Sequence, residues 1–216
     1  SPEMLASVQQ LGFDSPTPIQ DAAIPLIQQG IDVVGQSQTG SGKTAAFCIP
    51  VVEKISAKRK KPQALILVPT RELAKQVGNE VSKFSKYKKK LKTAVIFGGV
   101  SFRDQLRDIH GGAQVIIATP GRLLDHMEQG TLDLSTIKTL VLDEADRMLD
   151  MGFRDDVEKV LGKASPERQT IFFSATIGHS IKTLVEAFSN QPRYITVDQG
   201  SGQESVLVTE KGFKVR

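Results

Sequence analysis

Short apolar runs without polar alternation constrain the fold of this chain more than any other feature. Leu65-Ile66-Leu67-Val68 and Val115-Ile116-Ile117 are continuously apolar, which is typical of parallel strands covered on both faces. Because parallel strands need crossover connections, the segments between the runs are predicted to be helices. The pattern predicts an α/β fold, a doubly wound, mostly parallel sheet with helices on both faces. Seven strands are expected, near residues 32–35, 64–68, 93–97, 115–118, 139–142, 170–173 and 194–197.

Composition narrows the class of protein. The chain has 216 residues, a net charge of +4 and 39% hydrophobic residues, which is ordinary for a folded domain with a mild preference for polyanions. Its one cysteine, Cys48, cannot form an internal disulfide, and we expect it to be a buried core residue in a reducing compartment. We find no signal peptide and no apolar run long enough to cross a bilayer, so we expect a cytoplasmic or nuclear protein without a membrane partner.

Two helices can be placed from their terminal residues. Thr17 is a typical N-cap, Pro18 suits the first helical turn, and Gly30 suits the position after the last turn. A second helix is predicted from Lys43 to about Ile55. The segment 37–44 is therefore expected to be a loop that joins a strand to a helix.

This segment reads SQTGSGKT and has two interpretations. Gly and Ser are common in flexible turns, which is the simpler one. A loop between a strand and a helix is also where glycines let backbone N–H groups surround a phosphate. In that case Lys43 reaches the β- and γ-phosphates of a nucleotide, and the Thr44 hydroxyl binds Mg²⁺. The phosphate-binding pattern G-x-x-x-x-G-K-[ST] has glycine where this chain has Ser37.

A second acidic segment favours the phosphate site. The residues Asp143-Glu144-Ala145-Asp146 follow a predicted strand, so they should lie at the same edge of the sheet as the loop 37–44. Asp143 can hold Mg²⁺ through water, and Glu144 can orient and deprotonate an attacking water. The alternative, acids that complement a helix dipole, explains the charges but not their coincidence with the loop. We therefore favour a nucleotide-hydrolysing site.

Together the two segments resemble the DEAD-box family of ATP-dependent RNA helicases, in helicase superfamily two. Seven motifs of the family occur in the family's order over most of the chain. They are GFDSPTPIQ at 12–20, SQTGSGKT at 37–44, PTRELA at 69–74, Gly98-Gly99, TPGR at 119–122, DEAD at 143–146 and SAT at 174–176. One such motif is a weak signal, whereas seven in order are specific. The resemblance implies a RecA-like P-loop NTPase domain that uses ATP and Mg²⁺.

The resemblance also implies roles at the nucleotide. Gln20 would recognise the adenine edge, because its amide both donates and accepts hydrogen bonds. Glu144, Asp143 and Lys43 would be catalytic, while Thr44 and Asp143 would hold the metal. Family members also stack an upstream aromatic residue on adenine. This sequence starts too late to contain this residue, so we expect the stacking either to be lost or to come from a residue ahead of Ser1. The implied nucleotide-binding residues are Gln20, Ser37, Gln38, Thr39, Gly40, Ser41, Gly42, Lys43 and Thr44.

Further motif residues are implied to act on RNA. Contacts to the sugar–phosphate backbone hold RNA in position without reading its sequence, and the residues implied are Arg71, Gly99, Thr119 and Arg122. For the two arginines the alternative is surface charge at helix ends. The residues implied to couple the ATP state to unwinding are Ser174, Thr176 and Asp146. The three histidines, His110, His126 and His179, have no ligand-like spacing, so no zinc site is expected.

The resemblance divides the chain into three regions. Residues 1–30 form the glutamine-motif region, 31–199 the RecA-like ATP-binding domain, and 200–216 a linker or the start of a following segment with a weak strand pattern. Members of the family need a second RecA-like domain, which this sequence does not contain. We therefore expect the chain by itself to be monomeric and nearly inactive as an ATP hydrolase.

Two other functions stay open. A DNA helicase or translocase of the same superfamily usually carries a DEAH-like motif and lacks the glutamine motif, so Gln20 and Asp146 argue against it. A nucleotide-gated RNA-docking domain that never turns over alone would share every motif. The Lys/Arg clusters at 58–61 and 83–92 are expected to be solvated loops and helix ends.

Overall fold

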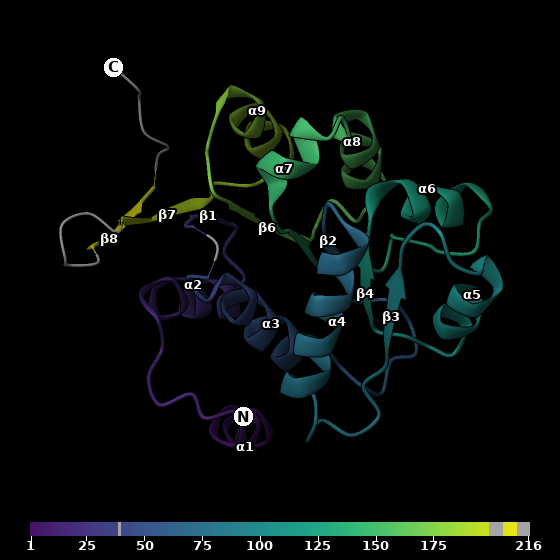
Figure 1. Ribbon diagram of the computed structural model, residues 1–216, viewed down its shortest axis with the longest axis horizontal. Helices are drawn as coiled ribbons and strands as arrows, with labels where there is room; N and C mark the ends of the chain where they lie inside the picture. The colour runs from purple at the N-terminus through teal and green to yellow at the C-terminus, as the bar shows by residue number, and fades with distance from the viewer. Residues whose placement is uncertain (39, 199–204, 211–216) are drawn as a thin grey trace.

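The computed structural model describes residues 1–38, 40–198 and 205–210 (Figure 1). Their strands form one eight-stranded sheet in the order β3-β4-β2-β5-β6-β1-β7-β8. Strands β1 to β7 pair in parallel, and β8 pairs antiparallel with β7 at one edge. The strands are β1 Val33–Gln36, β2 Ala64–Leu67, β3 Thr93–Ile96, β4 Val115–Ala118, β5 Thr139–Leu142, β6 Gln169–Ser174, β7 Arg193–Asp198 and β8 Ser205–Thr209.

The helices form a layer on each face of the sheet (Figure 1). Helices α1 to α4 pack on one face, and α5 to α9 pack on the other. This arrangement confirms the doubly wound α/β fold. The helices are α1 Pro2–Gln10, α2 Pro18–Gln28, α3 Lys43–Lys54, α4 Arg71–Phe84, α5 Phe102–His110, α6 Pro120–Glu128, α7 Ala145–Asp150, α8 Arg154–Lys163 and α9 His179–Phe188.

All seven predicted strands are present, and their ends differ from the prediction by no more than one residue. The helix between Thr17 and Gly30 is also confirmed, and Gly30 ends it with a φ of +85°. The weak strand pattern in 200–216 corresponds to β8, which joins the sheet next to β7. The turn residues ahead of it lie outside the described residues.

Burial on both faces explains why the central strands lack polar alternation. In β2, Ala64 and Ile66 face the core beneath α1 to α4, while Leu65 and Leu67 face the core beneath α5 to α9. All four are fully buried, so neither face of the strand tolerates a polar residue. Cys48 is buried in the first of these cores, as expected.

The topology brings the motifs to one edge of the sheet. Each motif that follows a strand lies at the carboxyl end of that strand, and in parallel strands these ends share an edge. Strand β6 lies between β1, which precedes the loop 37–44, and β5, which precedes Asp143. The end of β6, Ser174, is therefore between the two halves of the predicted nucleotide site.

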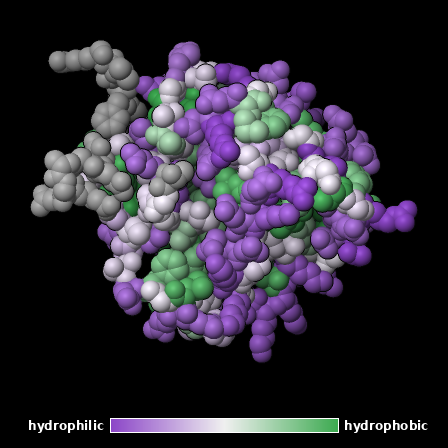
Figure 2. Space-filling model, in the orientation of Figure 1, coloured by the Kyte–Doolittle hydropathy of each residue, from purple (hydrophilic) through white to green (hydrophobic). Residues whose placement is uncertain are grey.

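The face of the molecule seen in Figure 2 is mostly hydrophilic, with hydrophobic residues in small separate areas. Exposed apolar side chains on β8 include Val206, Leu207 and Val208. None of the helices in the described ranges is long and apolar enough to span a membrane.

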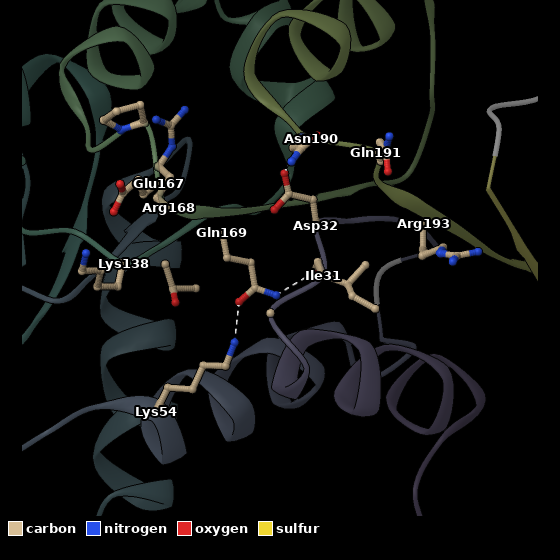
Figure 3. A pocket seen from close by; sticks show the side chains of 13 residues that line it. Ile31, Asp32, Lys54, Lys138, Glu167, Arg168, Gln169, Asn190, Gln191 and Arg193 are labelled. Carbon is tan, nitrogen blue, oxygen red and sulfur yellow. Dashed lines mark hydrogen bonds between the residues drawn. The ribbon is translucent and has the colours of Figure 1, made fainter.

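A polar cavity of about 670 Å³ lies at the opposite, amino-terminal edge of the sheet (Figure 3). Buried hydrogen bonds explain most of its polar lining. The Asp32 carboxylate accepts hydrogen bonds from the backbone N–H groups of Thr170 (2.8 Å) and Asn190 (2.7 Å). The Gln169 amide donates to the carbonyl of Ile31 (2.6 Å) and accepts from Lys54 (2.7 Å). The cavity wall thus joins α2, β1 and β6, which is a structural role.

We predict that Gln169→Ala destabilises the fold by about 1–3 kcal/mol, because it leaves the carbonyl of Ile31 and the Lys54 amine without this buried partner. Urea unfolding gives the free energy. Glu167→Ala, an exposed neighbour, is the control and should change it by less than about 0.5 kcal/mol. Equal values for the two variants would contradict the structural role.

Candidate functional site

The loop 37–44 has the backbone of a phosphate-binding loop. Gly40 and Gly42 have φ values of +83° and +92°, in the left-handed region that side chains disfavour. Helix α3 begins directly after Gly42, so its first N–H groups point toward the loop. The Lys43 side chain is only 7% exposed, and its Nζ donates to the carbonyl of Ser37 at 2.7 Å. Thr39 lies outside the described residues.

Ser37 occupies the position where the phosphate-binding pattern has glycine. Its side chain is buried, and Ser41 Oγ lies within hydrogen-bond distance of Ser37 Oγ, at 2.9 Å. Ser41 Oγ also donates to the carbonyl of Gln38 at 2.8 Å. The departure from the pattern therefore adds a hydrogen bond within the loop.

Hydrogen bonds hold the glutamine motif against the same loop. The Gln20 amide accepts a hydrogen bond from Thr17 N (3.0 Å) and donates to the carbonyl of Gly42 (3.2 Å). The Thr17 hydroxyl donates to the carbonyl of Ser41 at 2.9 Å. Sequence reasoning treated Thr17 only as a helix cap and missed this second contact. The contact of Gln20 with adenine stays a prediction.

Asp143 lies at the carboxyl end of β5 and is 3% exposed. Its backbone N–H donates to the carbonyl of Leu67 at 2.9 Å, which continues the pairing of β5 with β2. Burial, with a smaller contribution from the charge of Glu144, raises the pKa of Asp143 to about 6, against the attraction of Lys43. A cation bound beside this carboxylate would compensate for its desolvation.

Glu144 has an unusual backbone conformation for a side-chain-bearing residue, with φ +50° and ψ +48°. Such a conformation costs of order 1–3 kcal/mol and is typical of functional sites. Its Oε2 accepts a hydrogen bond from Arg147 Nη1 at 3.0 Å. Sequence reasoning missed Arg147, although its position one turn after Glu144 was a usable signal.

Hydrogen bonds join the SAT and DEAD motifs. The Asp146 carboxylate accepts from the Thr176 backbone N–H (2.8 Å) and hydroxyl (2.9 Å). Ser174 Oγ accepts from Asp146 N at 3.2 Å and donates to the carbonyl of Thr176 at 2.7 Å. Burial acts to raise the pKa of Asp146, but the hydrogen bonds from Thr176 and Ser174 hold it below its ordinary value. The three predicted coupling residues thus form one network.

Two of the predicted RNA residues lie together near β3. Arg71, at the start of α4, places its guanidinium 5.2 Å from the centre of the Phe97 ring. A Cβ on Gly99, which has a φ of +81°, would lie 3.6 Å from Arg71 Nη1. Lys75 lies over the same ring at 5.5 Å. Lys75, one turn after Arg71 in α4, extends this basic surface. The fold brings the buried ring of Phe97 beneath both side chains.

The other two lie at the start of α6. Thr119 is its N-cap, and its backbone N–H donates to the carbonyl of Ile96 at 2.9 Å. Arg122 pairs with Asp125 at 3.3 Å and donates to the carbonyl of Val100 at 3.1 Å. These bonds connect α6 to the loop that contains Gly99. The four residues therefore line one stretch of the carboxyl edge, after β2, β3 and β4. Strands β5 and β6 lie between this stretch and β1, which precedes the nucleotide loop.

Of the three histidines, His126 has structural surroundings, while His110 and His179 are exposed. His126 is buried and stacked on Phe102 at 4.0 Å between ring centroids, and it contacts Thr131 and Gln105. The described residues contain no group of three His, Cys, Asp or Glu that could hold a metal. A site with one carboxylate and one hydroxyl, Asp143 and Thr44, suits Mg²⁺, which keeps waters and binds substrate phosphates.

Comparisons with known proteins identify relatives of this chain. ATP-dependent RNA helicase DeaD of Mycobacterium tuberculosis is 48% identical over 195 residues, which are 90% of this chain and 35% of that protein. DEAD-box ATP-dependent RNA helicase CshA of Geobacillus kaustophilus is 46% identical over 91% of this chain and 42% of its own length. The chain thus spans less than half the length of these curated relatives.

The solved structures and a family profile agree. A DEAD box protein from the hyperthermophile Methanococcus jannaschii superposes with a TM-score of 0.87 at 41% identity, over 91% of this chain and 53% of that one. The profile described as DEAD/DEAH box helicase matches residues 17–184, which include all the loops described above except the first residues of the glutamine motif. This chain belongs to the DEAD/DEAH box helicase family.

Proposed function

We propose that this chain is the ATP-binding part of an ATP-dependent RNA helicase, which couples ATP binding and hydrolysis to RNA unwinding or RNP remodelling. The observation that carries the proposal is the order β1-β6-β5, because it sets Lys43 and the acids of the DEAD motif on either side of Ser174. A nucleotide loop without hydrolysis would not need these acids beside it.

The residues of the chain divide the chemistry among them. Lys43 leaves the carbonyl of Ser37 and neutralises charge on the β- and γ-phosphates. The Thr44 hydroxyl, and the Asp143 carboxylate through water, would hold Mg²⁺, whose positive charge would stabilise the negative charge that develops on the transferred phosphoryl group. The left-handed backbone of Glu144 directs its carboxylate toward the attacking water, whose proton it accepts.

Coupling to RNA uses the network of Ser174, Thr176 and Asp146. Because Asp146 belongs to the same short segment as Glu144, a shift of the acids on hydrolysis would also move the end of β6. Arg71, Gly99, Thr119 and Arg122 bind the RNA backbone, which positions RNA without selecting a sequence. A second RecA-like domain would add the remaining RNA contacts and arginines at the γ-phosphate.

We further propose that the glutamine-motif region spans 1–30, the ATP-binding domain spans 31–199, and 200–216 is a linker or the start of a following segment. Helices α1 and α2 of the first region pack on the same core as α3 and α4, which supports treating it as part of the domain. The single buried cysteine supports a reducing compartment, the cytoplasm or the nucleus.

We predict that Glu144→Gln in the full-length protein lowers RNA-stimulated ATP hydrolysis by about 10²–10⁴-fold, because it removes the general base. Nucleotide affinity should stay near the parent value, since the amide keeps the shape of the side chain. Steady-state hydrolysis and fluorescent-nucleotide titration measure the two. Turnover at the parent rate would rule out Glu144 as the base.

Asp143 should make stability depend on pH. In the folded chain its pKa is about 6, against 3.8 in the unfolded chain, so the folded state binds the extra proton between these values. The free energy of unfolding therefore falls as the pH rises through this window. The amide that Asp143→Asn introduces does not titrate, so the free energy of unfolding of this variant does not fall in this window. Without nucleotide or Mg²⁺, Asp143→Asn should therefore be more stable than the parent at pH 7 by up to about 3 kcal/mol.

Unfolding of both proteins by urea at pH 4 and pH 7 tests this expectation. The difference between variant and parent should be small at pH 4 and large at pH 7. Nucleotide binding in the presence of Mg²⁺ should change in the opposite sense, because the asparagine removes charge from the metal site. A pH-independent difference in stability would contradict the assigned pKa.

We predict that Gln20→Ala lowers the preference for ATP over GTP by about 1–3 kcal/mol, as other amide–adenine pairs do. Thr17→Val is the matched control, because it removes the bond to the carbonyl of Ser41 but leaves the Gln20 amide in place. Competition titrations with both nucleotides measure the preference. If both variants weaken ATP and GTP equally, Gln20 acts only by holding the loop.

A further inference from the structure

The two Lys/Arg clusters of the sequence form one surface in the structure. The loop 56–63 precedes β2, the segment 85–92 precedes β3, and the loop 110–114 precedes β4. Because these strands are parallel neighbours, the three segments meet at the amino-terminal edge of the sheet. This edge is opposite to the one that contains the nucleotide loop and the DEAD motif.

Buried hydrogen bonds hold these segments together. The side chain of Gln114, which is 1% exposed, accepts from Lys92 N (2.7 Å) and donates to the carbonyl of Ala57 (3.3 Å). A Cβ on Gly112 would lie 3.1 Å from Lys60 Cβ. The cluster before β2 is therefore adjacent to the cluster before β3, although about 30 residues separate them in the sequence.

Packing accounts for only three of the lysines. Lys88 Nζ donates to the carbonyls of Val52 (2.7 Å) and Glu53 (2.8 Å) and so caps the end of α3. Lys92 Nζ donates to the carbonyl of Gly111 at the end of α5, and Lys83 pairs with Glu80. Such contacts satisfy helix ends, where cations are favourable.

Seven other cations are exposed, and their charged groups form no hydrogen bond or ion pair within the described part of the chain. We call them the basic strip: Lys58, Arg59, Lys60, Lys61, Lys86, Lys89 and Lys90. The segments 56–63 and 81–92 contain no Asp or Glu, and Asp133 is the acid that acts on the strip, through Lys61. The seven cations exceed the net charge of the whole chain, which is +4.

Asp133 offsets part of the mutual repulsion within the strip, through Lys61, and Glu53 and Glu3 act on the neighbouring Lys88. Lys88 and Lys92 already bind the carbonyl ends of α3 and α5. The effect of a helix dipole falls off within one turn, so it does not account for the other cations. Lys90 also has a φ of +73°, where a loop selected only for its turn would favour glycine or asparagine. A partner of opposite charge would explain why single-sign charge gathers at this edge.

We propose that the basic strip is a second RNA-binding surface, which takes the phosphate backbone of single-stranded RNA. Six of its seven cations are lysines, which bind phosphates as mobile point charges, and the guanidinium of the seventh matches a phosphate bidentately. Tyr87 is 42% exposed between Lys86 and Lys88, with Lys86 Nζ 5.8 Å from its ring centre. An exposed ring among cations offers a stacking surface for an unpaired base.

The strip is separate from the RNA residues proposed above. The four-residue strands β2 to β4 hold the two edges apart, at about 3.3 Å per residue plus the loops at each end. One RNA strand engaged at the carboxyl edge could therefore continue to the strip only around the side of the domain. The strip would keep RNA attached while the carboxyl edge releases it.

The experiment compares two charge-removal variants of the full chain that lose two cations each. Lys60→Gln/Lys89→Gln removes one cation from each cluster of the strip, and Lys58→Gln/Lys90→Gln is a second such variant. Lys159→Gln/Lys163→Gln removes two exposed lysines from α8 and is the matched control. Binding of single-stranded RNA about 20 nucleotides long is measured between about 50 and 200 mM salt.

The strip variants should bind RNA several-fold more weakly at low salt than the parent. The slope of the logarithm of affinity against the logarithm of salt should fall by about 0.7 for each lost phosphate contact, while the control keeps the parent slope. Tyr87→Leu should weaken binding of single-stranded RNA, and Tyr87→Phe should not. Unchanged thermal midpoints establish that the variants are folded.

Repeating the measurement on Arg71→Ala/Arg122→Ala separates the strip from the carboxyl-edge site. The strip variants should still lower affinity there, and if Arg71 and Arg122 themselves prove to have no effect, the proposed function fails while the strip stands. Parent affinity and slope in both strip variants would overturn the proposal. So would polyglutamate binding that exceeds RNA binding at equal charge, which would identify an acidic protein as the partner.

Discussion

Parallel pairing of β1, β6 and β5 is the constraint on which the rest of the molecule depends. It requires helical crossovers, which cover both faces of the sheet, and it aligns the carboxyl ends of the strands at one edge. Strand β6 pairs with both neighbours, so Ser174 lies between the nucleotide loop and the DEAD acids. The end of β6 is therefore adjacent to both halves of the candidate site.

Two residues at this edge, Asp143 and Glu144, have features that lower the stability of the fold. Asp143 is a buried carboxylate with a raised pKa, and Glu144 has a left-handed backbone. Neither feature by itself stabilises the fold. The surrounding parallel strands make both tolerable, because Asp143 N donates to the carbonyl of Leu67 and Asp146 N donates to Ser174 Oγ. Both features lower the free energy of unfolding at a place where a bound nucleotide and cation would raise it again.

Much of the fold could be predicted from the sequence, because strands buried on both faces appear in it as continuous apolar runs. The continuous runs at β2 and β4 and the caps of α2 predicted the elements within one residue. Strand β8 was only a weak expectation, since an edge strand with exposed Val206 and Leu207 has no strong apolar pattern. The motif loops were also predictable, since glycines with left-handed backbones and acids after a strand are local features.

What the sequence by itself determined is the set of residues and the order of strands and helices, because backbone propensity and burial act over a few neighbours. The tertiary structure decided which distant groups meet. Thr17 reaches the carbonyl of Ser41, Thr176 reaches Asp146, and Gln114 joins two lysine clusters into one strip. Such contacts depend on which strands are neighbours in the sheet, and the pairing order arises from packing of the whole chain rather than from any segment.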